Sequence, residues 1–326
     1  MVNKITKGVI LASGNGTRSR PATYYVPKPM LPLGDTPIAK LLTYQMIEAG
    51  IKDILVVSRN DEEGIGTFKM MLDYFSGLKV ADNLKEYKNE IERGEIKIAL
   101  DFQPVDSITK KPLGTAAGLK VAYDNGFLKN EPCVVMFSDV IQESRCGKSL
   151  LEKMLSEYDG NTLVSMKTNS LERITEKSAA YGRKTGENLY KLDKVVEKPQ
   201  KEYVVENPTV LSVAGGVYIL NEDAQNKSGH IKKGVNGEYH ITDLIDHQAR
   251  EGKVYGYLID TDKFKPYDVG EFDVFIRENL EEKYRKDFFS YVKSSNAQLK
   301  AVLLGGVAMY GNDKDLRQLR SFLGLD

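Results

Sequence analysis

The sequence predicts an α/β fold with a mixed, mostly parallel sheet flanked by helices. Short apolar runs of strand length recur along the chain, and segments with helical periodicity separate them. Strands alternating with helices are typical of parallel sheets that are covered on both faces, in which ligands bind at the carboxyl ends of the strands. The predicted strands are residues 9–12, 54–58, 96–100, 133–137 and 163–166.

Three helices are predicted in the first half of the chain. The first covers residues 36–49, with Thr36 as its N-cap and Pro37 at the first helical position. The second covers residues 66–75, whose apolar positions form one stripe. The charged stretch 82–94 predicts a solvated helix inserted before the next strand.

The pattern changes in the second half. Residues 191–196 and 212–220 are short and rich in β-branched side chains, which predicts an antiparallel addition that carries a second ligand subsite. Residues 241–250 read as another helix. After Gly270 the pattern is helical almost to the end, with interruptions at Gly305-Gly306 and at Gly311, and with a last helix capped by Asn312.

Composition excludes several classes of protein. The 46 basic and 46 acidic residues leave no net charge that would attract nucleic acid or an anionic membrane. The sequence shows no secretory signal, and its apolar stretches are too short to span a bilayer. Cys133 and Cys146 form neither a metal-binding spacing nor a disulfide framework. We therefore expect a cytoplasmic protein with small-molecule ligands and with neither nucleic acid nor membrane as a partner.

A glycine turn followed by cations predicts a polyphosphate site near the N-terminus. Gly14 and Gly16 flank one residue directly after the first strand, so the backbone can turn sharply and point N–H groups at an anion. Arg18 follows, and Lys28 stands between two prolines. Position 19 is serine, where the dinucleotide-binding turn needs its third glycine, so a nicotinamide-dependent dehydrogenase is disfavoured.

Residues 11–18 and 28–33 resemble the signature of sugar-1-phosphate nucleotidyltransferases, and most closely the bacterial UTP–glucose-1-phosphate uridylyltransferases. The resemblance extends in ordered motifs over about residues 5–285 and implies that family's Rossmann-like sheet. The chain has Ser13 where the family usually has Gly or Ala. By this resemblance, Arg18 would contact the leaving pyrophosphate and Lys28 the α-phosphate, as the catalytic residues. The implied nucleotide-binding residues are Leu11, Ala12, Gly14, Gly16, Thr17, Gln103 and Gly114.

Two aspartates are candidate metal ligands. Asp139 ends a buried strand, where a carboxylate can hold Mg²⁺ on a substrate phosphate, although turns and N-caps also use aspartate at such places. Tyr267-Asp268-Val269-Gly270 resembles the second metal-ligand motif of the family, with Asp268 predicted at the start of a helix. The resemblance implies one Mg²⁺ site shared by Asp139 and Asp268.

Residues 196–199 resemble the family's sugar-phosphate motif. The resemblance implies that Lys198 neutralises the phosphate and that Glu197 accepts hydrogen bonds from sugar hydroxyls. The other residues implied for the sugar pocket are Gly182, Gly216 and Tyr218. The stretch 237–243 also resembles a family motif, which we interpret mainly as helix capping.

The implied reaction is Mg²⁺-assisted attack of glucose-1-phosphate on UTP, giving UDP-glucose and pyrophosphate. Its nucleophile is an ionised phosphate oxygen, so the reaction needs no general base. The same chemistry with dTTP, CTP or another sugar phosphate, and an inactive regulatory homologue, stay open as alternatives. We expect a catalytic domain over residues 1–270, with its nucleotide part at about 1–140 and its sugar-phosphate part at about 141–270. The segment over 271–326 is predicted to be helical and is crowded with aromatic residues, which would either cover the protein's own core or face another subunit; we favour an oligomer contact.

Overall fold

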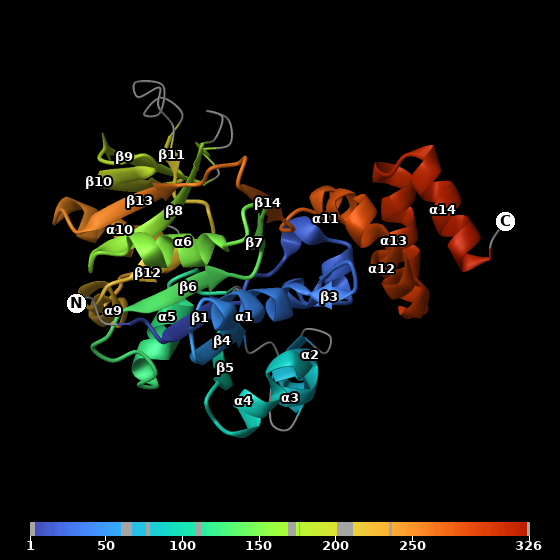
Figure 1. Cartoon of the computed structure of the whole chain (residues 1–326), viewed down its shortest axis with the longest axis horizontal. Coiled ribbons are helices and arrows are strands. Elements are labelled where there is room, and N and C mark those ends of the chain that lie inside the picture. Colours follow the sequence, from blue (N-terminus) through green and yellow to red (C-terminus); the bar gives the residue numbers. More distant parts are fainter. Residues whose placement is uncertain are drawn as a thin grey trace.

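A ten-stranded mixed sheet forms the centre of the protein, with strand order β11-β9-β10-β13-β8-β12-β6-β1-β4-β5 (Figure 1). The computed structural model describes residues 4–59, 67–75, 79–108, 112–168, 174–175, 177–200, 211–234 and 237–324. The strands are β1 (Lys7–Leu11), β4 (Asp53–Arg59), β5 (Lys97–Gln103), β6 (Cys133–Phe137), β8 (Thr162–Thr168), β9 (Ser178–Lys184), β10 (Leu189–Glu197), β11 (Leu211–Ser212), β12 (Val217–Leu220) and β13 (Val254–Leu258).

The N-terminal half supplies the parallel part of the sheet. β1 lies between β6 and β4 and runs parallel to both, and β4 pairs in parallel with β5. The register places Leu11 beside Phe137, so β1 and β6 end side by side. The segments that follow these two strands therefore leave the sheet at the same point, which is where ligands bind in parallel sheets.

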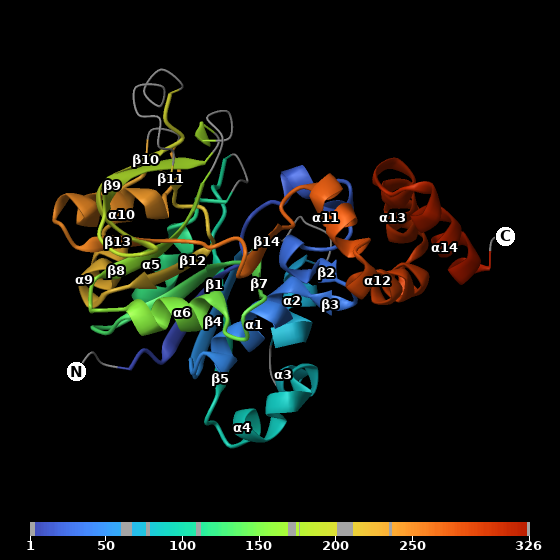
Figure 2. The same cartoon turned by 45° about the horizontal axis from the view of Figure 1, so that its top comes forward.

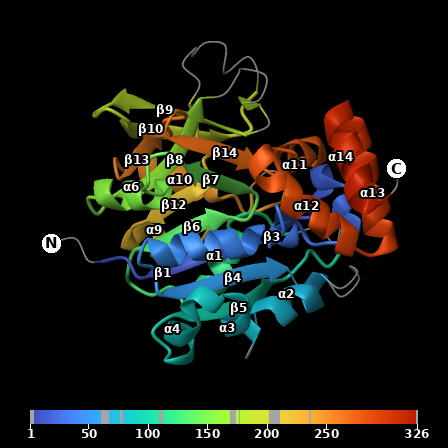
Figure 3. The ribbon, with the colours of Figure 1, turned by 45° about the vertical axis from the view of Figure 1, so that its right-hand side comes forward.

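Helices cover both faces of this sheet, as predicted. Alternate residues of β1 point to opposite sides, with Ile10 in one core cluster and Val9 and Leu11 in the other. Helices α1 (Ile38–Glu48) and α6 (Leu150–Glu157) contribute to the Ile10 side. Helices α5 (Ala117–Asp124), α9 (Glu222–Ser228) and α10 (Ile241–Arg250) contribute to the other side. Figure 3 shows α1 lying across the sheet, and α2 to α4 gathered beyond the edge strand β5.

The predicted antiparallel addition is present and continues the same sheet. β10 pairs antiparallel with β9 and with β13, and β12 inserts antiparallel between β6 and β8. The predicted strand over 212–220 is wrong in one respect, because it divides into β11 and β12 around Gly215 and Gly216. A register shift near Leu192 marks a bulge in β10.

Two local predictions are wrong. Thr36 and Pro37 form the short strand β3, which pairs with β2 (Pro32–Leu33), so α1 begins only at Ile38. The charged stretch 82–94 is not one helix. It contains the end of α3 (Lys79–Asn83), a 3₁₀ turn and α4 (Lys88–Glu92), while α2 (Thr67–Phe75) follows the prediction closely.

A separate two-stranded ribbon connects the site region to the C-terminal helices. β7 (Val140–Ser144) directly follows Asp139, and β14 (Phe264–Asp268) pairs with it antiparallel. The register places Asp268 opposite Val140, and the Val269 amide donates to the Asp139 carbonyl at 3.1 Å. Asp268 therefore ends a strand, and its predicted place at a helix start is wrong: α11 begins only at Phe272.

The C-terminal segment is helical and lies at one end of the molecule (Figures 1 and 2). It comprises α11 (Phe272–Asn279), α12 (Glu282–Ser294), α13 (Ala297–Tyr310) and α14 (Asp313–Leu323). The predicted interruption at Gly305 and Gly306 is wrong, since α13 runs through both. A Cβ atom on Gly306 would lie 2.8 Å from side-chain atoms of Ile276, so close packing of α13 on α11 explains this glycine. Asn312 caps α14, as predicted.

Candidate functional site

A pocket of about 310 Å³ lies where β1, β6 and β10 end, and we call it the strand-end pocket. Six separate stretches of the chain meet there, and they bring seven of the sixteen predicted site residues together. Its lining residues are Leu11, Ser13, Gly14, Asn15, Lys28, Pro112, Gly114, Thr115, Phe137, Ser138, Asp139, Glu197, Lys198, Glu238 and His240.

The turn after β1 depends on Gly16 more than on Gly14. Gly16 has φ +61°, and a Cβ atom there would lie 2.8 Å from the Thr23 side chain. The Thr23 hydroxyl donates to the Gly16 carbonyl at 2.7 Å, which fixes the turn. Gly14 lies outside the left-handed region, and a Cβ atom on it would meet open space. Its lack of a side chain therefore leaves room in the pocket, beside the buried Ser13.

Lys28 and Asp139 form an ion pair inside the pocket. The Lys28 Nζ lies 2.8 Å from Asp139 Oδ2, and the lysine side chain is only 10% exposed. Burial opposes ionisation of Asp139, but the Lys28 charge and hydrogen bond hold the pKa of this carboxyl below its ordinary value. The segment that carries Lys28 is the 3₁₀ turn Lys28–Met30, whose Pro29 and Met30 are buried.

Arg18 does not line the strand-end pocket. Its guanidinium lies 3.4 Å from the Glu271 carboxylate, and both side chains are partly exposed. Arg18 instead lines a second cleft of about 430 Å³, between the opening loop and α13. Lys28 therefore pairs directly with the candidate metal ligand, whereas Arg18 does not contact it and acts only through its charge, which helps to lower the pKa of Asp139. Thr17, which starts the 3₁₀ turn, is exposed beside it.

Ser19 ties the opening loop to the ribbon. Its side chain is fully buried, and its hydroxyl donates to the Gly270 carbonyl at 2.8 Å, with the Val269 carbonyl at 3.3 Å. Val269 in turn contacts Asp139 through the backbone, so the opening loop and both candidate metal ligands are held together by short contacts. Position 19, where the dinucleotide-binding turn has its third glycine, is thus held by a serine whose hydroxyl contacts the ribbon.

The turn over residues 112–115 closes another side of the pocket. Gly114 has φ +103°, and a Cβ atom there would lie 2.4 Å from the Tyr239 carbonyl oxygen. The Tyr239 amide donates to the Leu113 carbonyl, and the Ala116 amide donates to the Tyr239 carbonyl. Only glycine fits both this backbone conformation and this contact.

Gln103, at the end of β5, is fully buried, and neither its amide oxygen nor its amide nitrogen has a hydrogen-bond partner among the described residues. Its oxygen lies 3.5 Å from the position that a Cβ atom on Gly118 of α5 would take, and Gln103 lines neither the strand-end pocket nor the larger one beside β10. A buried amide without partners is costly.

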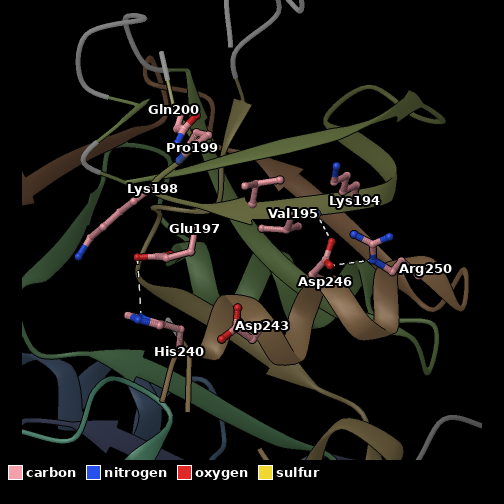
Figure 4. Close-up of a pocket in the computed structure, with 12 residues that line it drawn as sticks. Lys194, Val195, Glu197, Lys198, Pro199, Gln200, His240, Asp243, Asp246 and Arg250 are labelled. Carbon is pink, nitrogen blue, oxygen red and sulfur yellow. Dashed lines mark hydrogen bonds and ion pairs between the residues drawn. The ribbon is translucent and has the colours of Figure 1, made fainter. Parts of the chain in front are cut away.

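Glu197 and Lys198 close the pocket from the end of β10. Lys198 has φ +42°, an uncommon conformation for a residue with a side chain, and its amide donates to the Lys177 carbonyl at 2.7 Å. Both residues also line a larger pocket of about 770 Å³ between β10 and α10, which we call the β10 pocket (Figure 4). Figure 4 shows Lys198 and Glu197 pointing away from the Lys194 and Arg250 end of that pocket.

Other predicted site residues lie outside both pockets. Ala12 is buried, and its amide donates to the Val57 carbonyl. Gly182 lies in β9, where a Cβ atom would be 2.1 Å from the Lys191 carbonyl, so sheet packing explains it. Gly216 packs on Val140, and Tyr218 is a buried residue of β12. None of these four residues lines either pocket.

Sequence reasoning missed Glu238 and His240, which line the strand-end pocket. The interpretation of residues 237–243 as helix capping is wrong for His240: it occupies the N-cap position of α10 but makes no side-chain capping hydrogen bond. The resemblance of residues 237–243 to a family motif was the one feature of the sequence that could have indicated a place in the site.

The donor chemistry of the pocket fits a hard divalent cation. Asp139 supplies a carboxylate beside an open pocket, and Asp268 stands on the neighbouring strand of the ribbon, its side chain outside the described part of the structure. One or two carboxylates, completed by substrate phosphates, are what Mg²⁺ requires. Among the described side chains, His, Cys, Asp and Glu form no cluster of three that could hold a metal without such help.

Known proteins place this fold in the class of nucleotidyltransferases. Residues 7–284 match the family described as "Nucleotidyl transferase", so the chain belongs to that family and is an enzyme of the nucleotidyltransferase type. The UTP–glucose-1-phosphate uridylyltransferase YngB of Bacillus subtilis is 28% identical over 275 residues, covering 83% of this chain and 87% of the relative. UTP–glucose-1-phosphate uridylyltransferase 1 of Staphylococcus saprophyticus is 26% identical over 306 residues, covering 90% and 99%.

A solved structure of a UDP-glucose pyrophosphorylase complexed with UDP-glucose matches with a TM-score of 0.71 and 27% identity, covering 87% of this chain and all of that one. The predicted family and Rossmann-like fold are therefore confirmed, and the dehydrogenase alternative is wrong. No helix in the described parts of the chain combines the length and apolarity needed to cross a bilayer.

Proposed function

We propose that this protein transfers the uridylyl group of UTP to glucose-1-phosphate, giving UDP-glucose and pyrophosphate. The observation that carries the proposal is the strand-end pocket, which combines a glycine turn, two lysines and a strand-end carboxylate. Two lysines from distant segments suit two phosphate-bearing substrates. Relatives across most of the chain bear the name of this activity.

The reaction is an in-line displacement at the α-phosphorus of UTP. An oxygen of the sugar phosphate forms the new P–O bond, the bond to the bridging oxygen of the β-phosphate breaks, and pyrophosphate leaves with that electron pair. The attacking oxygen is ionised at neutral pH, so the residues act by positioning and charge neutralisation.

Each half of the pocket has a proposed task. The turn at Gly14–Gly16 receives the triphosphate, and Lys28 stabilises the charge that builds on the α-phosphate. Lys198 holds the phosphate of the sugar, and Glu197 accepts hydrogen bonds from its hydroxyls. Arg18, now paired with Glu271, would contact the pyrophosphate group from the edge of the site.

Asp139 and Asp268 would hold Mg²⁺, which would neutralise phosphate charge during the transfer. For the base, the unpaired amide of Gln103 and the turn at Gly114 are proposed to read uracil. The residues proposed for the triphosphate precede residue 140 and those proposed for the sugar phosphate follow it. This order supports a nucleotide part at about 1–140 and a sugar-phosphate part at about 141–270. The helices after residue 270 are proposed to contact another subunit.

Pyrophosphate release tests the proposal. The assay offers UTP, dTTP, CTP, ATP and GTP, each with glucose-1-phosphate and several other sugar phosphates, in the presence of Mg²⁺. We expect the highest kcat/KM for UTP with glucose-1-phosphate. A higher value for another pair would reassign the substrates, and turnover with none would favour an inactive regulatory homologue.

A further inference from the structure

The Glu197 carboxylate is held from the beginning of α10. The Thr242 hydroxyl donates a hydrogen bond of 2.8 Å to Glu197 Oε2. The other oxygen, Oε1, lies 3.9 Å from Nδ1 of His240. The first residues of one helix thus face both oxygens of a single carboxylate, and Figure 4 shows the Glu197 and His240 side chains pointing toward each other.

These partners are themselves fixed. Thr242 and His240 are 5% and 8% exposed, so the surrounding structure restricts their side chains. The main chain of this segment is tied down as well, because the Ile241 amide donates to the Thr115 hydroxyl at 3.1 Å. Glu197, in contrast, is the last residue of β10 and is followed by Lys198 with its positive φ.

His240 stands at the junction of the two pockets. It lines both the strand-end pocket and the β10 pocket, together with Glu197 and Lys198. Its Nε2 atom lies 3.8 Å from the Glu238 carboxylate, on the opposite side from Glu197. The ring therefore borders both pockets beside Glu197.

We propose that Thr242 and His240 are positioning residues that orient the Glu197 carboxylate toward the hydroxyl groups of the glycosyl phosphate. The inference rests on the proposed function, because it assigns a task to residues behind the sugar subsite. A carboxylate with one oxygen hydrogen-bonded to Thr242 and the other facing the His240 ring rotates less freely, so less entropy is lost when it accepts hydrogen bonds from a sugar.

A double-mutant cycle tests this role. Thr242→Val and His240→Gln are each made alone and in combination with Glu197→Ala. We expect each single variant to raise the KM for glucose-1-phosphate about tenfold and to leave the KM for UTP within twofold. In the Glu197→Ala background, the same substitutions are expected to cause no further change.

Two matched variants control for packing and for helix α10. Thr43→Val removes a buried hydroxyl that donates to the Ala39 carbonyl in α1, far along the chain from the site. His247→Gln removes an exposed histidine of α10 that lies 3.3 Å from Glu251. Both are expected to keep the KM for glucose-1-phosphate of the unmodified protein.

The inference is overturned if the losses persist without Glu197, if both KM values change together, or if neither variant has an effect while the unmodified protein turns over. The absence of any turnover by the unmodified protein would instead overturn the proposed function, and this inference with it.

Discussion

The Lys28 ammonium lies 2.8 Å from the Asp139 carboxylate, and the two side chains come from segments 111 residues apart. Each neutralises the other in a partly buried pocket, so removing one charge leaves the other uncompensated. Asp139→Asn keeps the size of the side chain and removes its charge. We expect kcat to fall at least about 1,000-fold, because the proposed metal ligand is lost.

The control for this variant is Asp159→Asn, an exposed aspartate whose side chain accepts from the Asn161 amide. It should keep normal turnover. Thermal unfolding and circular dichroism show whether Asp139→Asn still folds. Near-normal kcat in a folded Asp139→Asn protein would contradict the metal assignment.

Ser19→Ala tests the contact between the opening loop and the ribbon. Loss of a buried hydrogen bond of about 0.5–1.5 kcal/mol predicts a rise of about two- to tenfold in the KM for UTP, with the KM for glucose-1-phosphate unchanged. Steady-state kinetics with each substrate varied in turn provides the measurement. Ser228→Ala is the matched control, since its buried hydroxyl donates to the Gln225 carbonyl within α9. If Ser228→Ala raised the KM for UTP as much as Ser19→Ala, the Ser19 hydroxyl would have no specific role in the nucleotide site.

Gln103→Leu separates ligand reading from stability. The buried amide lacks a partner among the described residues, so an apolar side chain of similar volume should leave Tm unchanged or higher. The preference for UTP over CTP should fall about tenfold or more, because the proposed contacts to the base are lost. Competition between the two nucleotides measures this ratio directly. A lower Tm with an unaltered ratio would show that the amide serves the fold alone.

Lys198→Ala should weaken binding of the sugar phosphate. Removing a cation that contacts a phosphate predicts an increase of about 10- to 100-fold in the KM for glucose-1-phosphate, with a small effect on the KM for UTP. Lys184→Ala, at an exposed position of β9, is the control for a general change of charge. A defect confined to the KM for UTP would be incompatible with the proposed role.

The raised pKa of the Glu197 carboxyl makes the stability of the protein depend on pH. Burial raises the pKa of this carboxyl, against the hydrogen bond from Thr242 and the nearby His240 and Lys198. A raised pKa means that the folded protein favours the protonated form of this carboxyl. The resulting stabilisation is complete below the pKa of the unfolded state, about 4.3. It is lost as the pH rises through the higher pKa of the folded state. Glu197→Gln, which has no such titration, should therefore unfold at a higher Tm than the unmodified protein at pH 7, by about 1–3 °C. The difference should disappear near pH 4. A constant difference across this range would exclude ionisation of Glu197 as its cause.

The sheet and the strand-end residues could be predicted because each depends on local pattern. The apolar run at 133–137 coincides with β6, and residues 241–250 coincide with α10. Asp139 could be singled out because a carboxylate lies two residues after such a run and because the motif resembles that of the family. Asn312 was found because capping is set by neighbours three residues away.

The predictions are wrong where contacts with distant segments determine the local conformation. Thr36 and Pro37 have the sequence of a helix start, but pairing with Pro32 and Leu33 makes them a strand. Gly305 and Gly306 suggest a break, yet contacts of Gly306 with α11 favour a continuous helix. The direction of Arg18 depends on Glu271, more than 250 residues away in the sequence, which no local pattern contains.

The backbone of Tyr239 is hydrogen-bonded to both Leu113 and Ala116, and the Ile241 amide to Thr115. These bonds join the turn beside the proposed nucleotide site to the start of the helix behind the proposed sugar site. Consider a chimera in which everything after residue 140 comes from a relative. Its hydrogen bonds between residues 112–116 and 237–242 would then join segments of two different proteins. Residues 112–116 and 237–242 would have to be transplanted together, and substrate preference could then evolve on one half only as far as the other half permits.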